Sequence, residues 1–463
     1  MTIRYPPPGL VRLNPSFVLL GILLGVLWLT GGASRADVLG QVVSRAAAWV
    51  VLILAIVLGA KPSLREYRAT LLLLLAVIAL PLLQMIPLPP SLWQNLPGRA
   101  QLTEAAVVIG QSQPWRPLAI VPGAAENAAA SLVVPLTVFV LVASLTERER
   151  SWLPGLLLIL IATCTLVGLL QFSGFGFNNI FANDTPGQVS GTFANRNHFA
   201  LFLAFGCMLA PVWAFLDGRE PQWRGPAALG LVLLFALTIL ASGSRTGLVL
   251  GVLGGGLGLL LVREGVRNAL RRYPRWAFPA LIAGIVGLMA LFVLISVAAG
   301  RAVSINRVFE LDAAQDMRAR ALPTVVAMIR TYFPFGSGLG GFDPIYRIHE
   351  PFDLLNLTYH NHAHNDFLEI VLDAGLAGFV LLLSALLWWT WRSARVWRSR
   401  PGPRHALPRL GSAMLLLVFI ASIFDYPART PMIMAMIVVA GVWLGERVQV
   451  YRGSALPRSG QPL

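Results

Sequence analysis

Residues 69–90 read ATLLLLLAVIALPLLQMIPLPP, a run without a single ionisable side chain. A helix that crosses a bilayer needs about 20 predominantly apolar residues. This run meets that requirement, and similar apolar runs recur along the chain. Each run predicts a membrane-spanning helix, because a helix satisfies all of its backbone hydrogen bonds within lipid.

The composition of the whole chain supports the same interpretation. Of the 463 residues, 56% are hydrophobic and 12% are charged, and the mean hydropathy is +0.70. Soluble domains carry about 25% charged residues, and disordered chains need low hydrophobicity. These values exclude an ordinary soluble enzyme and a disordered protein. They predict an all-α polytopic membrane protein.

We expect about twelve spans, with short first and second members. No small-residue cleavage site stands out after the first run, which disfavours a signal peptide. The predicted spans are residues 16–31, 47–60, 69–90, 128–146, 152–172, 198–216, 227–242, 246–262, 276–299, 367–391, 411–425 and 432–446.

The basic residues predict the orientation of these spans. The net charge of +15 comes from 36 basic and 21 acidic residues, and Lys61 is the only lysine. The arginines lie in short loops between apolar runs, where they determine topology, so we expect no nucleic acid partner. The positive-inside rule places both termini in the cytoplasm. The expected organisation is nine spans in 1–299, a large extracytoplasmic loop at 300–366, and three spans with a cytoplasmic tail in 367–463.

The glycine-rich stretch in the eighth predicted span indicates close helix packing. The pairs Gly251/Gly255 and Gly254/Gly258 have the spacing small-xxx-small. Small residues at this spacing allow two helix backbones to approach each other in a membrane.

The loop at 300–366 concentrates the ionisable residues. It holds four of the six histidines and seven of the 21 acids. Its end reads HNHAHND and allows two conformations. In an extended segment the three histidines and Asp366 would share one face, a plausible set of metal ligands. If a helix begins here instead, Asn365 is a suitable N-cap, and His364 just before it is a candidate general base. A purely structural polar loop is the third alternative.

Arginines form two further candidate sites. Arg245 in SGSRTG, at the outer junction of two apolar runs, either snorkels to lipid head groups or binds a phosphate. Arg318 and Arg320 begin an amphipathic helix that ends near Pro334, and solvated ion pairs are their alternative role. The glycine-rich segment after this helix contains GxGxxG, but we expect neither a strand before it nor a helix after it. It is therefore interpreted as a turn.

Some motifs are absent from the chain. It contains no DxD and no GxxxxGK[ST], and the middles of the predicted spans lack carboxylates in convincing positions. These absences disfavour a nucleotide-sugar glycosyltransferase, an ATP-driven transporter and a proton-coupled transporter.

Four segments occur in a characteristic order. They are GTFANRNHFA at 191–200, Ser244-Arg245, the helix and PFGSGLGGF that follow Arg318 and Arg320, and His364-Asn365 followed after nine residues by GLAG. Together they resemble the O-antigen ligase and polymerase family of bacterial inner-membrane glycosyltransferases. The resemblance covers about residues 190–380.

The resemblance implies an all-helical membrane glycosyltransferase of the GT-C-like class that acts without a metal or other cofactor. Its donor would be a glycan on undecaprenyl diphosphate in the inner membrane. The acceptor, on the periplasmic side, would be a glycan: lipid A–core for a ligase, or another lipid-linked repeat unit for a polymerase. These motifs do not separate a ligase from a polymerase or from a protein-directed transferase, because all three need the same donor site.

The resemblance also assigns roles to residues. His364 matches the catalytic base, Arg245 a diphosphate ligand, and either Arg318 or Arg320 a second one. Further residues expected to line the substrate site are Asn195, Asn197 and His362, although packing between helices would also explain the two asparagines.

The alternative in another functional class is a transporter or flippase of lipid-linked glycans, which would have a similar number of spans. The ionisable residues lie mainly in one external loop, and no repeat of two halves is visible. Both features favour the transferase.

Overall fold

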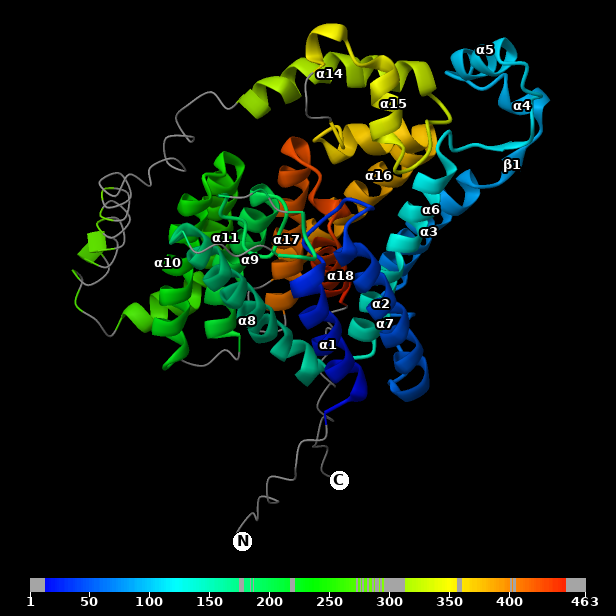
Figure 1. Ribbon diagram of the computed structural model, residues 1–463. Helices are drawn as coiled ribbons and strands as arrows, with labels where there is room; N and C mark the ends of the chain where they lie inside the picture. Colours follow the sequence, from blue (N-terminus) through cyan, green and yellow to red (C-terminus); the bar gives the residue numbers. More distant parts are fainter. Residues whose placement is uncertain are drawn as a thin grey trace, which may run out of the picture.

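Apolar helices make up almost all of the fold (Figure 1). The computed structural model describes residues 13–174, 179–216 except 184 and 186, 221–271, scattered positions between 274 and 294, 313–355, 360–399, 402 and 405–446. In these residues eight helical segments are long and apolar enough to cross a membrane. They are α2 (Leu39–Leu58), α6 (Pro122–Ser131) continued by α7 (Val133–Ala143), α8 (Glu147–Phe172), α9 (Arg196–Phe215), α10 (Arg224–Ser242), α11 (Arg245–Leu270), α16 (Asp366–Arg398) and α17 (Ala406–Phe424).

Shorter elements complete the described fold. Three short apolar helices pack among the long ones: α1 (Pro15–Thr30), α3 (Arg68–Gln84) and α18 (Pro431–Gly445). Strands β1 (Pro87–Leu88) and β2 (Arg116–Pro117) form a small antiparallel pair. The other elements are α4 (Pro90–Trp93), α5 (Ala100–Val108), α14 (Ala313–Tyr332), α15 (Phe342–His349), η1 (Phe352–Leu354) and η3 (Pro427–Arg429).

The structure confirms the prediction of an all-α polytopic membrane protein. Eleven of the twelve predicted spans coincide with these apolar helices, and the ninth, 276–299, lies largely outside the described residues. The second span differs most from its prediction, since α2 begins at Leu39 instead of residue 47. Its first two turns include Arg45, a charged residue before the uninterrupted apolar run.

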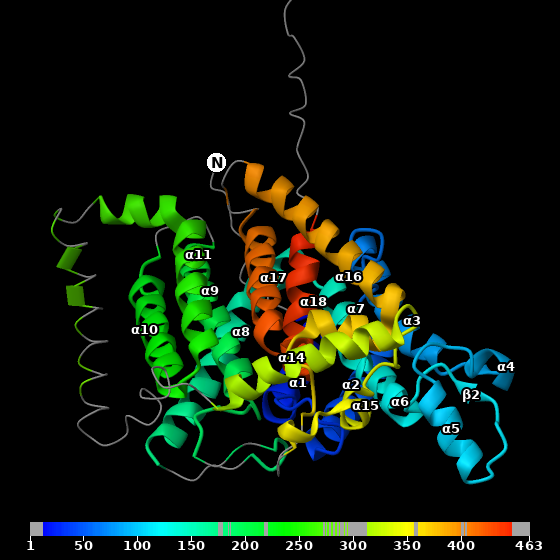
Figure 2. The same cartoon turned by 90° about the horizontal axis from the view of Figure 1, so that it is seen from above.

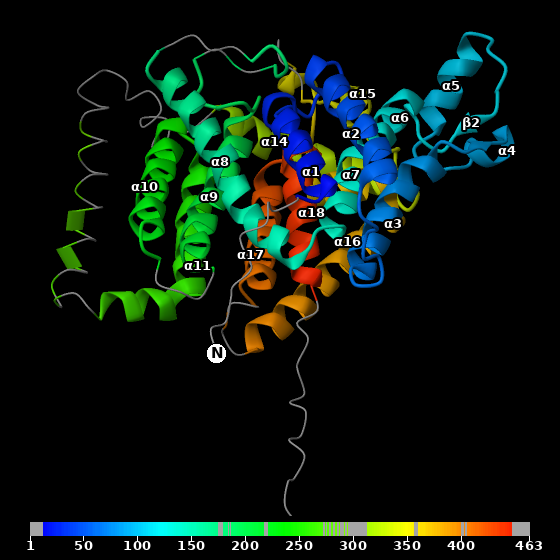
Figure 3. The ribbon, with the colours of Figure 1, turned by 90° about the horizontal axis from the view of Figure 1, so that it is seen from below.

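The bundle has two groups of helices with a pair between them. Seen from below, α8 to α11 lie on one side, α2, α3, α6 and α7 on the other, and α17 and α18 between the two groups (Figure 3). Among these eight segments α9 is the most enclosed, because 89% of its most apolar stretch is buried inside the protein. Its burial is consistent with its sequence, because a helix that is hydrophobic all round packs in the interior.

Helices α14 and α15 lie over one end of the bundle, across α16 (Figures 1 and 2). The turn between them is fixed to α16 by three main-chain hydrogen bonds: Ser337 N to Leu372 O, Gly338 N to Asp373 O and Leu376 N to Pro334 O. Their lengths are 3.0, 2.9 and 2.8 Å. The expectation that no helix follows this turn is wrong, since α15 begins at Phe342 and buries Phe342, Ile345 and Tyr346.

This attachment requires glycine in α16. Gly375 has φ +55° and interrupts the helix. A Cβ atom there would lie 2.0 Å from the carbonyl oxygen of Pro334. Glycine alone tolerates both the left-handed backbone and the close approach.

The glycines of α11 allow it to approach α9. A Cβ on Gly254 would lie 2.6 Å from Ala204 O, and one on Gly258 would lie 3.0 Å from Met208 O. Of the predicted small-residue pairs, Gly254/Gly258 therefore packs against a neighbouring backbone. The prediction of close packing for Gly251/Gly255 is wrong in part. Gly251 faces Ile239 of α10, but no heavy atom lies within 4 Å of the position that a Cβ on Gly255 would occupy.

Gly254→Ala should lower the melting temperature of the detergent-solubilised protein, because its methyl group meets a backbone oxygen. We expect a cost of about 1–3 kcal/mol, as for other overpacked positions. Gly255→Ala is the matched control. It adds the same methyl group and raises the helix propensity by the same amount, but the added methyl group meets no neighbouring atom. Equal melting temperatures for the two variants would contradict this account of the α9–α11 interface.

Candidate active site

Several helix ends meet at one end of the bundle, and each is closed by a polar residue. Asn195 caps α9 through Asn197 N at 2.8 Å, Ser244 caps α11 through Gly247 N at 2.9 Å, and Asn365 caps α16 through Leu368 N at 3.0 Å. Such side chains accept hydrogen bonds from the backbone amides that a helix leaves unpaired at its start. The same caps bring polar side chains to one place.

Asp425, directly after the last residue of α17, is the centre of this arrangement. Its Oδ2 accepts hydrogen bonds from Nδ2 of Asn195 at 2.9 Å and from Nδ2 of Asn197 at 2.7 Å. Its Oδ1 lies 3.0 Å from Nδ1 of His364. The carboxylate is 2% exposed. A buried charge of this kind needs several donors, and here they come from two separate segments, the start of α9 and the loop before α16.

The partners of Asp425 keep it ionised. Burial alone would raise its pKa, but the hydrogen bond from His364 and the charge of Arg318 outweigh burial and hold the pKa well below its ordinary value. Asp425 is therefore a fixed anion that orients the groups around it.

His364 is held with one ring nitrogen on Asp425. Because a carboxylate only accepts, Nδ1 of His364 carries the proton of this hydrogen bond, and Nε2 is the nitrogen with a lone pair. Burial is the main cause that lowers the pKa of His364, although Asp425 opposes it. The residue has φ +51°, an uncommon conformation for a side chain other than glycine. A neutral, oriented imidazole is suited to accept a proton.

The structure distinguishes between the two conformations considered for residues 360–366. Asn365 caps α16 and His364 precedes it, as in the helical alternative. The side chains of the extended alternative separate: His362 contacts Glu369 at 2.8 Å, and Asp366 accepts from Ser422 at 3.0 Å. In the described part of the chain no group of three or more His, Cys, Asp or Glu side chains has the geometry of a metal site.

Arg318 and Arg320 have different surroundings. Nη1 of Arg318 lies 3.5 Å from the carbonyl oxygen of Phe424, next to Asp425, and its charge acts on both Asp425 and His364. Arg320 instead contacts Asp353 at 3.2 Å and is 45% exposed. Of the two arginines, the structure places Arg318 at the candidate site and Arg320 in a surface ion pair.

Arg245 is connected to the site through its neighbour. It is the first residue of α11, and the hydroxyl of Ser244 before it donates to Oδ1 of Asn197 at 2.7 Å. Asn197 in turn donates to Asp425. The two asparagines thus orient Asp425 and Ser244. This role is more specific than the predicted one, which was only to line the substrate site.

A second buried cluster lies on the other side of Tyr426. Arg429 of η3 contacts Glu369 at 3.1 Å, Asp366 at 3.4 Å and Asp373 at 3.6 Å. The acids are three and four residues apart, so they share one face of α16. His362 belongs to this cluster through Glu369, and its ring lies 4.2 Å from that of Tyr426.

Asp425, Tyr426 and Arg429 were not among the site residues predicted from the sequence. One signal was present: Asp425 is the only acid between residues 411 and 445, a nearly continuous apolar stretch. An ionisable residue in such a stretch indicates a functional site by default. Its partners lie 61 and about 230 residues away in the sequence, so the sequence alone could not identify them.

Comparison with known proteins adds one finding. No curated protein matches the chain. The family model described as O-Antigen ligase matches residues 230–383, which include Arg245, Arg318, His362 and His364. Over this segment the chain is similar to the O-antigen ligase family, and the predicted resemblance is confirmed.

Proposed function

We propose that this protein is an inverting glycosyltransferase that needs no metal ion. It transfers or polymerises a glycan carried on undecaprenyl diphosphate, with its active site on the periplasmic side of the inner membrane and both termini in the cytoplasm. The observation that carries the proposal is the buried His364–Asp425 pair with Arg318 beside it. The O-antigen ligase family match supports the class of reaction.

In the proposed reaction His364 is the general base. Its Nε2 accepts the proton of the acceptor hydroxyl while the hydroxyl oxygen forms a bond to the anomeric carbon of the donor. Asp425 stabilises the resulting imidazolium through the hydrogen bond to Nδ1, as the carboxylate does in a catalytic triad. The acceptor attacks opposite the leaving group, so the anomeric configuration inverts. The proton then passes from His364 to water.

The leaving group in this reaction is undecaprenyl diphosphate. As the bond from the anomeric carbon to the diphosphate oxygen breaks, its electron pair leaves with that oxygen and negative charge develops there. Arg245 and Arg318 would stabilise this charge, because guanidinium groups bind phosphate oxygens in a bidentate manner. Asn195, Asn197 and His362 hold the surrounding groups in place.

The first prediction concerns the reaction in cells. A deletion strain complemented with His364→Ala should have the same polysaccharide pattern on a gel as the uncomplemented deletion. Polymer that accumulates on the lipid carrier would identify a ligase, and single repeat units would identify a polymerase. His405→Ala, far from the site and before α17, is the matched control and should restore the wild-type pattern. Full activity of His364→Ala would exclude His364 as the general base and would favour the alternative function, a flippase.

The second prediction separates the two arginines. Arg318→Ala should lower kcat/KM for the lipid-linked donor by about 10²- to 10³-fold, the usual loss for a group that stabilises transition-state charge. Arg320→Ala should change it by less than about fivefold, since an exposed ion pair contributes at most about 1 kcal/mol. Steady-state kinetics with purified protein measure both variants. The reverse order would place the diphosphate at Arg320.

The third prediction concerns pH. The neutral form of His364 is active, so activity should fall as the pH drops through its lowered pKa, below the ordinary value of about 6.5. Asp425 raises that pKa, so Asp425→Asn should move the acid limb to still lower pH. The maximal rate should fall by about 10²- to 10⁴-fold. Asp353→Asn, in the surface ion pair, is the control. An acid limb that moves to higher pH would contradict the assignment.

A further inference from the structure

A cavity of about 560 Å³ lies between α2, α3, α6 and α16, away from the arginines assigned to the donor. We call it the α3–α16 cavity. One part of its wall is polar and includes Arg45, Gln41, Asn127, Ser131, Asn361 and His362. The other part is apolar and includes Leu73, Val77, Leu80, Leu381, Leu382 and Ala385. A space divided in this way fits a molecule with a polar head and an apolar chain.

Arg45 is the notable residue of the polar wall. It lies in the second turn of α2, within a helix long and apolar enough to span the membrane. Its Nη2 donates to Gln41 at 3.1 Å, whereas its Nε is buried without a hydrogen-bond partner among the residues that the structure describes. A cation at this depth is costly unless it binds an anion. Amide and hydroxyl groups beside it are suited to the hydroxyls of a sugar.

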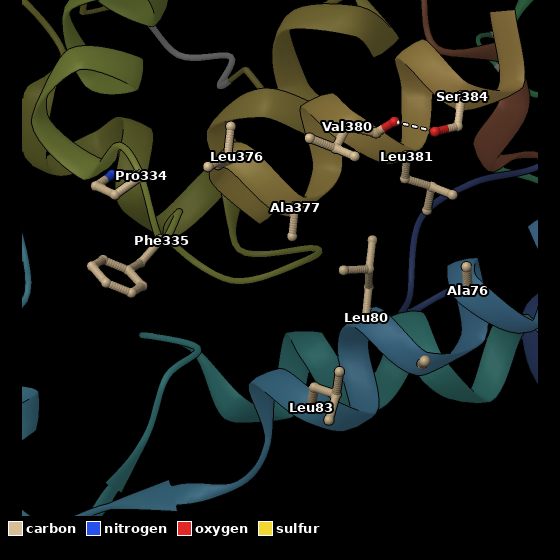
Figure 4. Close-up of a pocket in the computed structure, with 11 residues that line it drawn as sticks. Ala76, Leu80, Leu83, Pro334, Phe335, Leu376, Ala377, Val380, Leu381 and Ser384 are labelled. Atoms are coloured by element: carbon tan, nitrogen blue, oxygen red, sulfur yellow. Dashed lines mark hydrogen bonds between the residues drawn. The ribbon is translucent and has the colours of Figure 1, made fainter. Parts of the chain in front are cut away.

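The apolar wall continues outward as a groove. This groove has a volume of about 810 Å³ and shares Leu80 and Leu381 with the cavity. In Figure 4, side chains of α3, among them Leu80 and Leu83, face Ala377, Val380 and Leu381 of α16 across an open space. Leu83 is 60% and Val380 52% exposed. Apolar side chains that are exposed on membrane helices lie in contact with lipid chains, so the groove connects the cavity with the bilayer.

The inner end of the cavity lies close to the catalytic base. His362 lines the cavity and packs against Tyr426, whose ring also contacts that of His364, with centroids 4.9 Å apart. Asn361, also in the wall, donates to the hydroxyl of Tyr426 at 3.3 Å. The arginines assigned to the donor belong to α11 and α14, whereas this cavity belongs to α2, α3 and α16. A molecule in the cavity would therefore approach His364 from a different side than the donor.

We infer that the α3–α16 cavity and its groove bind the acceptor as a phosphorylated glycolipid. Its sugar head group occupies the polar part, its phosphate contacts Arg45, and its chains lie along the groove between α3 and α16. The inference rests on the proposed function, which requires an acceptor hydroxyl at His364. It adds where the acceptor is held, that Arg45 contacts its phosphate, and that it reaches the site from within the bilayer between α3 and α16.

Photolabelling of the full-length protein tests this inference without turnover. Cys164 and Cys207 are buried, so Ala377→Cys provides a reactive thiol in the groove for a benzophenone maleimide. The labelled protein is placed in phosphatidylcholine nanodiscs that contain a small fraction of lipid A, of an undecaprenyl-diphosphate-linked glycan or of phosphatidylglycerol. Mass spectrometry then identifies the adducts. Val252→Cys, on α11 and 78% exposed, is the control position and should label phosphatidylcholine alone.

We expect adducts with one of the two phosphorylated glycolipids, and the one that labels identifies the acceptor. Arg45→Gln, combined with Ala377→Cys, should reduce these adducts roughly tenfold, the effect of losing one charge-assisted hydrogen bond. Equal labelling by phosphatidylglycerol, or labelling that Arg45→Gln does not reduce, would overturn the inference. A third outcome would also overturn the inference. If the undecaprenyl-linked glycan labels the groove, and Arg318→Ala abolishes this labelling while Arg45→Gln does not, the groove binds the donor.

The two levels of the proposal fail separately. If the wild type shows Arg45-dependent labelling but transfers no glycan, the proposed function is wrong. If it transfers glycan and shows no Arg45-dependent labelling, only the acceptor site is wrong.

Discussion

The buried carboxylate of Asp425 is the constraint on which the rest of the site depends. An ionised group that is 2% exposed must be compensated by nearby donors. The donors come from the start of α9 and from the loop before α16, so the chain has to bring these segments to the end of α17. Removing the carboxylate would leave those donors without their common acceptor. The fold and the orientation of His364 therefore depend on the same interaction.

Around this centre the bundle separates two kinds of surroundings. On the side of α9, α11 and α14 lie the arginines to which we assign the diphosphate. On the side of α2, α3 and α16 lie Arg429, its three acids and the cavity to which we assign the acceptor. Tyr426 lies between them and contacts both His362 and His364. In the proposed reaction a lipid-linked donor and a lipid-anchored acceptor meet at one base, and separate approaches avoid competition between them.

The features that could be predicted from the sequence are those that depend on neighbouring residues. Apolar runs predicted the spans, and the HND sequence predicted the cap at Asn365 that places His364 before a helix. The spacing of Arg318 and Arg320 could not decide between them, because the difference arises from Asp353 and Phe424, elsewhere in the chain. Asp425 and Arg429 were missed for the same reason. Their importance comes from partners that only the tertiary structure brings close.

The glycine break in α16 has a consequence for the spacing of the two charged groups. Arg318 is on α14 and His364 is in the loop before α16, yet the turn after α14 is joined to α16 mainly by main-chain hydrogen bonds, to which Ser337 Oγ and Asp373 Oδ2 add two side-chain contacts. The separation between cation and base is thus set by peptide geometry, which does not vary with side-chain identity. The lipid-facing surface can accumulate substitutions without altering that separation, whereas Gly336, Gly338 and Gly375 at the attachment leave no room for a side chain.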